Sequence, residues 1–362
     1  MATKMNGLSH NLLIHPGETI KELIEEQGMS QEELAKRTTL STKHISKIIN
    51  GKMKISAMFA KKLEYVFNIP AKFWMNLQLI YDNEEIEIKE KNDIKEAEYL
   101  ILKELKKVTD YCIENKIISA SENKSSQVLE MRKFLRVSTL DSLSSLSLTK
   151  QVAFRVQTQK IINVNILHAW QRLCEYYTEN EEPENIFSVE KLKKEIDNIK
   201  ATMFLEVNDM RIKLKEIFSK CGVIFEIIPH FTGAPVQGYL ANKNDKIILC
   251  MTLRQSFADI FWFTLFHEIG HLVNDDLKGL FIDFIEYSTD KKEKNADIFA
   301  KNALINELDY INFIEKMPLT LENINLFAKK QKVKPYIVIG RIQKEKDDYS
   351  FLAKHKVQYK WS

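Results

Sequence analysis

Two histidines four residues apart are the strongest chemical signal in this chain of 362 residues. His267, Glu268 and His271 form the pattern His-Glu-x-x-His inside an apolar stretch that predicts a buried helix. Side chains four positions apart share one helix face, so both imidazoles can hold a single Zn²⁺ ion. The Glu268 carboxylate can then take a proton from an attacking water and deliver it to a leaving amine. The alternative is a pair of helix histidines satisfied by backbone or solvent.

A catalytic zinc site usually has three protein ligands and one open position, so a third ligand is needed. The acidic residues downstream of the motif are Asp275, Asp276, Asp283, Glu286, Asp290 and Glu293. We favour Glu293 because it begins a second predicted helix. In that helix Ala296 is small enough to let two helices approach closely, and Asp297 can fix the tautomer of a ligand histidine. The alternative for Glu293 is a carboxylate favoured only by the helix dipole.

A second candidate site lies near the N-terminus, where two short helices are predicted. Ser30 and Glu33 form a reciprocal capping box, which predicts a helix beginning near Gln31. A second helix over residues 41–50 ends at Gly51, in the position of a left-handed C-cap. The polar residues on its exposed face are Thr42, Lys43, Ser46 and Lys47. Such a pair is typical of a recognition helix that enters the DNA major groove.

Lysines surround this second helix. Between Thr38 and Leu63 there is no acidic residue, and the lysines are Lys43, Lys47, Lys52, Lys54, Lys61 and Lys62. Such a patch can neutralise DNA phosphates, with an affinity that falls as salt rises. The net charge of the whole chain is only +3, so DNA affinity must come from this local patch. The alternative is a solvated basic face of a helical bundle.

The elements that position these residues change in type along the chain. We expect a helix-turn-helix DNA-binding domain over 1–82, a helical connecting region over 83–218 and an α+β domain over 219–362. In the last domain, β-branched runs at 221–229, 237–241 and 246–252 predict a small antiparallel sheet, with helices returning from about Ser256. The predicted fold class is therefore mainly α.

Composition indicates the compartment. The 4 cysteines are scattered without a C-x-x-C pair, which excludes a disulfide scaffold and favours reduced thiols. The N-terminal residues lack the apolar region of a secretion signal, and no stretch reaches the roughly 18 apolar residues of a membrane span. We therefore expect a cytoplasmic protein without a membrane partner.

The N-terminal region resembles the HigA-type antitoxins of the XRE class of helix-turn-helix proteins. The matching blocks are residues 15–18, 30–35, 48–52, 55–56, 73–78 and 81–82. The resemblance implies a five-helix, lambda-repressor-like domain that binds a palindromic operator as a homodimer. The implied DNA-binding residues are Gln31, Ser41, Thr42, Lys43, His44, Lys47 and Lys52, with base contacts from Thr42, Lys43 and Lys47. Thr38 and Thr39 occupy a turn where many relatives have a glycine.

The C-terminal region resembles the ImmA/IrrE family of zincin-like metallopeptidases. The matching blocks are residues 221–223, Gly238, 261–264, 266–272, 293–300 and 338–343, and residues 135–140 resemble the long fused members. The spacing from Glu293 to Asp297 is similar to that of gluzincin peptidases. The resemblance implies a zinc-dependent endopeptidase that cleaves a transcriptional repressor in response to stress or prophage induction.

Two functions follow as hypotheses. In the first, the N-terminal domain binds operator DNA and the C-terminal domain uses zinc and Glu268 to cleave a repressor, an antitoxin-like protein or the chain itself. In the second, the chain is a HigA-like antitoxin that represses its operon and neutralises a RelE-fold ribonuclease toxin, with the metal domain as a non-proteolytic scaffold. A third hypothesis combines both, with the metal domain switching DNA binding off.

Several other residues near the predicted sheet carry weaker signals. Tyr239, His230 and Arg254 can polarise a substrate carbonyl, but a structural or solvent-facing role is favoured for each. Trp170 and Trp262 are expected in the core. Arg341 either binds a carboxylate or serves packing, and the residues alone leave both roles open.

Overall fold

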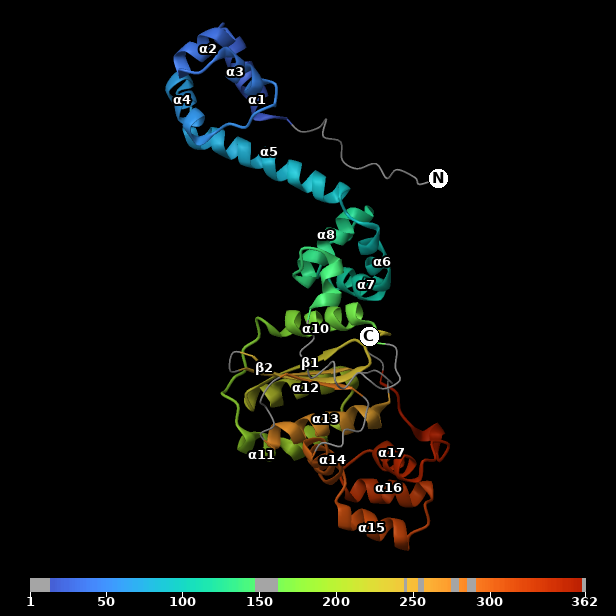
Figure 1. The fold of residues 1–362 in the computed structure, drawn as a ribbon. Helices are drawn as coiled ribbons and strands as arrows, with labels where there is room; N and C mark the ends of the chain where they lie inside the picture. The colour runs from blue at the N-terminus through green and yellow to red at the C-terminus, as the bar shows by residue number, and fades with distance from the viewer. Residues whose placement is uncertain are drawn as a thin grey trace, which may run out of the picture. The chain divides into compact units, whose positions relative to one another are not determined.

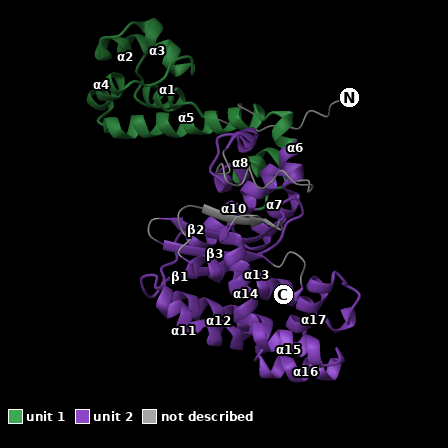
Figure 2. Ribbon diagram, turned by 60° about the horizontal axis from the view of Figure 1, so that its bottom comes forward, with its two compact units in different colours: residues 1–99, 120–130 green, residues 100–119, 131–362 purple. Residues whose placement is uncertain are grey.

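The chain folds into two units, seen in a computed structural model that describes residues 14–146, 162–243, 246–252, 257–274, 280–284 and 291–359. The first unit comprises residues 1–99 and 120–130, and the second comprises residues 100–119 and 131–362 (Figure 2). The fold is mainly helical with one small sheet, as predicted. No helix among the described residues is long and apolar enough to cross a bilayer.

Five helices of the first unit surround one hydrophobic core (Figure 1). They are α1 (Pro16–Glu26), α2 (Gln31–Thr38), α3 (Thr42–Ile49), α4 (Ala57–Phe67) and α5 (Ala71–Asn92). Each contributes a side chain that is 0% exposed: Ile20, Leu34, Ile45, Leu63 and Trp74 in chain order. The apolar faces of these helices therefore pack on one another and enclose a single core.

Three further helices follow, namely α6 (Glu96–Glu104), α7 (Lys106–Glu114) and α8 (Lys124–Leu135). Two borders between the units fall within α6 and α8, and the third, at residues 119 and 120, falls between α7 and α8. The domain limits expected at 82 and 218 instead fall inside α5 and α12 (Val207–Lys220). Both helices continue past the limits because no glycine or proline interrupts their sequences there.

The second unit contains a four-stranded sheet with the order β1-β3-β2-β4. Its strands are β1 (Val223–Ile228), β2 (Val236–Lys243), β3 (Lys246–Thr252) and β4 (Leu280–Phe284). The expected hairpin forms between β2 and β3, which pair antiparallel. The predicted small antiparallel sheet differs from the structure in one pairing, because β1 pairs parallel with β3, and it lacks β4, which pairs antiparallel with β2. β4 escaped prediction because its short run of 5 residues follows a long helix.

Helices cover both faces of this sheet (Figure 1). α10 (Val164–Thr178) packs against one face, where the Trp170 ring lies 6.1 Å from that of Tyr239. The other face packs on α12 and α13 (Ala258–Val273) through Phe225, Leu240 and Leu249. Trp170 and Trp262 are both buried, as predicted.

The remaining elements of the second unit complete this layer and extend it at the C-terminal end. The α-helices are α11 (Val189–Ala201), α14 (Lys291–Leu304), α15 (Glu307–Lys316), α16 (Leu321–Lys330) and α17 (Pro335–Lys346). The short 3-10 helices are η2 (Leu140–Ser145), η3 (Thr202–Phe204) and η4 (Ala353–His355). Among them α14 packs most extensively on α13, and this pair builds the candidate metal centre.

Candidate metal centre and nucleic-acid surface

The candidate metal centre lies on α13, a helix that is apolar around most of its circumference. Phe261, Trp262 and Phe266 belong to the main core of the second unit, so the helix packs over a broad face. His267 and His271 follow on the same helix and are buried. Their position inside the core keeps the site at low polarity, where interactions between charges are stronger than in water.

Glu293 of α14 reaches both histidines. Its Oε2 atom lies 3.3 Å from His267 Nε2 and 3.6 Å from His271 Nε2, and the two nitrogens are 3.1 Å apart. Ligand atoms about 2.0–2.1 Å from a tetrahedral zinc ion lie about 3.3 Å from one another. The three ligand atoms therefore have spacings close to those of ligands around one tetrahedral metal ion, and Glu293 is the acidic residue that completes this candidate cluster in the described part of the chain.

Asp297 holds His267 from the outer side of its ring. Its Oδ1 atom lies 2.8 Å from His267 Nδ1. A carboxylate at this nitrogen keeps the proton on Nδ1 and leaves the lone pair of Nε2 facing Glu293 and His271. The four-residue spacing between Glu293 and Asp297 thus places both carboxylates around one imidazole.

A close contact between two small residues lets α14 approach α13. Ala296 is 0% exposed, and a Cβ atom added to Gly270 would lie 2.9 Å from Ala296 Cα. A contact this short excludes any side chain at Gly270 unless the helices separate. The separation between Glu293 and the histidines therefore depends on this pair, which agrees with the role predicted for Ala296.

Glu268 lies beside the histidines and against the sheet. It is 1% exposed, and a Cβ atom added to Gly238 of β2 would lie 2.9 Å from Glu268 Cδ. The missing side chain of Gly238 is thus the space that the Glu268 carboxylate fills. Sequence reasoning included Gly238 among the matching positions without this role, since nothing in the sequence tells which strand residue faces the helix.

The carboxylates at this centre favour positive charge. Burial acts to lower the pKa of His271, but the hydrogen bond with Glu293 and the negative charge of Glu268 outweigh burial and raise it. The same negative charge favours a bound divalent cation. The site is thus built for a cation in its electrostatics as well as in its ligand spacing.

The other residues singled out near the sheet lie elsewhere. Tyr239 packs on Trp170 at the face of the sheet opposite Glu268, because alternate strand residues point to opposite faces. His230 lies in the loop after β1. Arg341 serves both of its possible roles: it pairs with Glu307 and its guanidinium carbon lies 3.7 Å from the Tyr310 ring centre.

Some predicted positions cannot be placed at the centre. Asp275, Asp276, Glu286, Asp290 and Arg254 lie outside the described residues. Asp283 lies in β4, where only the backbone is described, opposite Gly238.

The two short helices of the first unit have the expected caps. Ser30 Oγ accepts from the backbone N–H of Glu33 at 3.1 Å, and Ser41 Oγ accepts from that of His44 at 3.2 Å. Gly51 has a φ of 70°, the left-handed conformation predicted for it. The reciprocal half of the capping box is absent from the described hydrogen bonds, because the Glu33 carboxylate accepts from Arg37 one turn later. The charged guanidinium group of Arg37 is a stronger donor to the Glu33 carboxylate than the backbone N–H of Ser30.

The turn between α2 and α3 uses threonine where a glycine is more common. Thr39 adopts a left-handed φ of 53°, which a β-branched residue rarely does. Lys62 of α4 secures it: its Nζ donates to Thr38 O at 2.6 Å and to Thr39 Oγ1 at 2.8 Å. The turn is therefore held by a side chain distant in sequence.

The six lysines around α3 separate into two groups. Lys54 pairs with Asp82, Lys61 pairs with Glu64, and Lys62 holds the turn. The other three, Lys43, Lys47 and Lys52, are exposed and make no ion pair within the described part of the chain. Gln31 and His44 are half-buried at this surface, while Ser41 and Thr42 are exposed. The cations open to a ligand are thus those on and just after α3.

The fold and the two sites define a DNA-binding regulator joined to a metallopeptidase-type domain. Residues 20–74 match the helix-turn-helix family model, and residues 259–342 match the model of the IrrE N-terminal-like domain. The chain therefore carries an XRE-type helix-turn-helix domain and an IrrE-like domain of the metallopeptidase class.

Known proteins resemble the N-terminal part of this chain. Virulence-associated protein A' of Dichelobacter nodosus is 40% identical over 73 residues, which are 20% of this chain and 64% of that protein. The chain thus spans slightly less than two thirds of this relative. Antitoxin GraA is 31% identical, over 21% of this chain and 84% of its own, with a TM-score of 0.21. A structure described as Pseudomonas aeruginosa antitoxin HigA with higBA promoter is 30% identical, over 23% and 97%, with a TM-score of 0.22.

Proposed function

We propose that this protein is a transcriptional regulator whose IrrE-like domain is a zinc-dependent endopeptidase. His267, His271 and Glu293 would hold the metal, and Glu268 would be the general base. The observation that carries the proposal is the cluster of three ligand atoms, one from each side chain, all within 4.8 Å of one another. The substrate would be a repressor, an antitoxin-like protein or this chain itself.

A zinc ion bound here would lower the pKa of a water molecule and polarise the scissile carbonyl. Glu268 would take the proton from that water and return it to the leaving amine. Gly238 gives the Glu268 carboxylate its space against β2, and Asp297 keeps His267 in the tautomer that leaves Nε2 unprotonated. The apolar surroundings of α13 would keep bulk water away from these groups.

The first prediction tests the peptidase. Glu268→Gln should retain zinc at wild-type stoichiometry and lose proteolysis by at least about 100-fold, because the amide cannot accept the proton. Glu293→Gln is the matched control, since it changes the same group but should lose zinc. Zinc is measured by mass spectrometry of the metal, and cleavage by electrophoresis of candidate repressors and of the chain itself. Equal degradation by wild type and Glu268→Gln would exclude the proposed mechanism.

The N-terminal half of the proposal concerns operator DNA. We propose that α3 lies in the major groove, with Thr42, Lys43 and Lys47 at the bases and Lys52 at the backbone, and that Gln31, Ser41 and His44 complete the contact surface. The support is the separation of the six lysines: Lys43, Lys47 and Lys52 are exposed without an ion pair in the described structure, whereas the other three are held by Asp82, Glu64 and the turn. Two copies would bind one palindromic operator.

The second prediction tests that surface. Lys43→Ala and Lys47→Ala should each weaken operator binding by roughly tenfold, and loss of a phosphate contact should also reduce the dependence on salt. Lys61→Ala is the matched control: it lies on α4, is paired with Glu64 and should change affinity little. Gel shifts at several salt concentrations supply the measurement. An unchanged affinity in both α3 variants would contradict the recognition-helix assignment.

A second candidate function is that of an antitoxin that neutralises a RelE-fold toxin, with the metal domain as a scaffold. The identity of 31% to antitoxin GraA over 84% of that protein favours it. Co-purification with such a toxin, unchanged by Glu268→Gln, would support this function over proteolysis.

A further inference from the structure

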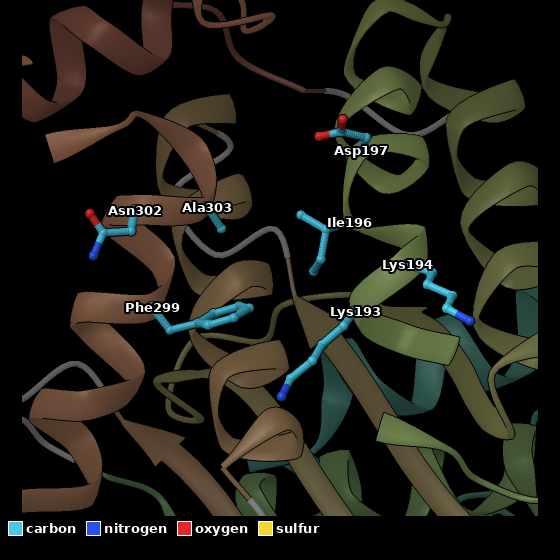
Figure 3. A pocket seen from close by; sticks show the side chains of 7 residues that line it. All are labelled: Lys193, Lys194, Ile196, Asp197, Phe299, Asn302 and Ala303. Carbon is cyan, nitrogen blue, oxygen red and sulfur yellow. The ribbon is translucent and has the colours of Figure 1, made fainter. Parts of the chain in front are cut away.

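A groove separates α11 from α14 on the second unit (Figure 3). Its volume is about 560 Å³. The side chains of Ile196, Phe299 and Ala303 point toward its centre, and Lys193 extends over it from α11 (Figure 3). The three apolar residues are half-buried and pack against the main core, so the floor of the groove is already formed. An apolar floor of this kind favours a ligand that brings an apolar side chain.

The rim of the groove is positively charged. Lys193 and Lys194 are exposed and have no ion pair in the described part of the chain. Asp197 is the acidic residue of the lining, and Lys332 lies 3.6 Å from it and offsets its charge. Glu190 and Glu195 of α11 do not belong to the lining. The remaining positive charge favours an acidic ligand.

The groove also shares a helix with the metal centre. Phe299 follows Asp297 by two residues on α14, and Asp297 contacts His267. A peptide bound in the groove therefore contacts the same helix that carries Glu293. Because α14 is fixed against α13 by the contact of Ala296 with Gly270, the two sites keep a constant separation.

We propose that this groove binds an extended acidic segment of the protein substrate, with an apolar side chain of that segment on Ile196 and Phe299. The identity of the partner as a substrate rests on the proposed peptidase function. A protein segment fits better than a nucleic acid, since the floor is apolar and the lining offers two lysines without the row of cations that tracks a phosphate backbone.

Binding is tested on the full chain carrying Glu268→Gln, so that no probe is cleaved. The probe is a fluorescein-labelled peptide of alternating glutamate and leucine, followed by fluorescence anisotropy. Lys193→Glu with Lys194→Glu should weaken its binding about tenfold. Phe299→Ala should weaken it comparably through the floor, with thermal unfolding recorded to verify the fold. Lys316→Glu with Lys329→Glu, an equal charge change on α15 and α16, should leave the affinity within about twofold.

Three results would overturn the inference. The first is unchanged peptide binding in the Lys193 and Lys194 double variant, and the second is an equal loss of peptide affinity in the control pair. The third is a single-stranded oligonucleotide of equal charge that binds more tightly than the peptide and whose binding the double variant abolishes. The peptidase proposal fails separately, if wild-type protein cleaves no partner while peptide binding at the groove persists.

Discussion

At the scale of single residues, the metal centre depends on two glycines as much as on its ligands. Gly270 allows α14 to approach α13, and Gly238 leaves the space that Glu268 occupies. An added methyl group would collide with Ala296 of α14 at Gly270 and with Glu268 at Gly238. The proposed metal binding and proton transfer should therefore be separable, because Gly270 sets the distances between the candidate ligands and Gly238 sets the position of Glu268.

The third prediction uses this separation. Gly238→Ala should leave zinc content near wild type but reduce proteolysis by about 10- to 100-fold, since a displacement of about 1 Å in a catalytic group has an effect of that size. Overpacking should also lower the free energy of unfolding by about 1–3 kcal/mol. Zinc analysis, proteolysis and chemical denaturation measure the three effects. Full proteolytic activity in this variant would show that Glu268 does not need its present position.

Much of the centre could be predicted from residue spacing. His267 and His271 share a helix, and Glu293 with Asp297 are related by one helical turn, so local geometry fixes each pair. The contact of Glu268 with Gly238 could not be derived, because it joins residues 30 positions apart on different elements. The side of the sheet to which Tyr239 points was hidden for the same reason.

At the scale of elements, the helix-turn-helix is stabilised by contacts from outside the two helices that define it. Lys62 of α4 fixes the turn, and His15 caps α1, with its Nδ1 accepting from Gly17 N at 2.9 Å. The N-terminus of α1 in turn packs closely on α3, since a Cβ atom on Gly17 would collide with the carbonyl of Ile48. The position of α3 therefore depends on the cap of α1.

The fourth prediction follows from that cap. Burial lowers the pKa of His15 below its ordinary value of 6.5, and the charges of Asp82, Glu85 and Glu18 offset this only in part. The folded state thus favours the neutral imidazole of His15. The stability that His15 contributes is therefore complete above pH 6.5, and it is lost as pH falls through the lower pKa of the folded state. Unfolding of the first unit should become easier between about pH 7 and 5.5.

Thermal unfolding of wild type and His15→Asn at both pH values provides the measurement. Asparagine can cap the helix without titrating, so the variant should lose part of the pH dependence. An identical pH dependence in both proteins would rule out His15 as its source.

Besides β4, a C-terminal segment went unrecognised in the sequence. The segment 356–359 crosses the start of α13: Lys356 pairs with Asp259 at 3.0 Å, and the Tyr359 hydroxyl accepts from Trp262 Nε1 at 2.8 Å. A short run of basic and aromatic residues has no periodicity that marks it as structured. Only tertiary packing gives it a place, as it also gives β1 its parallel partner.

At the scale of the whole molecule, the two functions lie in separate compact units. The proposed operator-binding surface belongs to the first unit, and the three candidate metal ligands belong to the second. Sequence reasoning predicted both because each has its own local pattern. Two of the unit borders fall within α6 and α8, where a continuous helical pattern gives no local signal of a border.

The fifth prediction concerns metal removal. A chelator should destabilise the second unit by about 3 kcal/mol where the metal had been at 100 times its dissociation constant, and leave the first unit unchanged. Hydrogen exchange should therefore increase in residues 258–273 and 291–304 but not in 31–49. His267→Ala is the control and should not respond to the chelator. Equal responses across both units would mean that the metal acts elsewhere.

The length of α5 has a practical consequence for dissecting this protein. The helix spans 22 residues without a break, so an N-terminal piece that stops at residue 82 would end in the middle of it and expose a frayed, partly apolar stump. A piece extended through Asn92 would keep the natural end of the helix. DNA-binding studies on the isolated N-terminal domain should therefore use the longer piece. In the shorter piece, a loss of affinity caused by the truncated helix would be mistaken for weak DNA contacts.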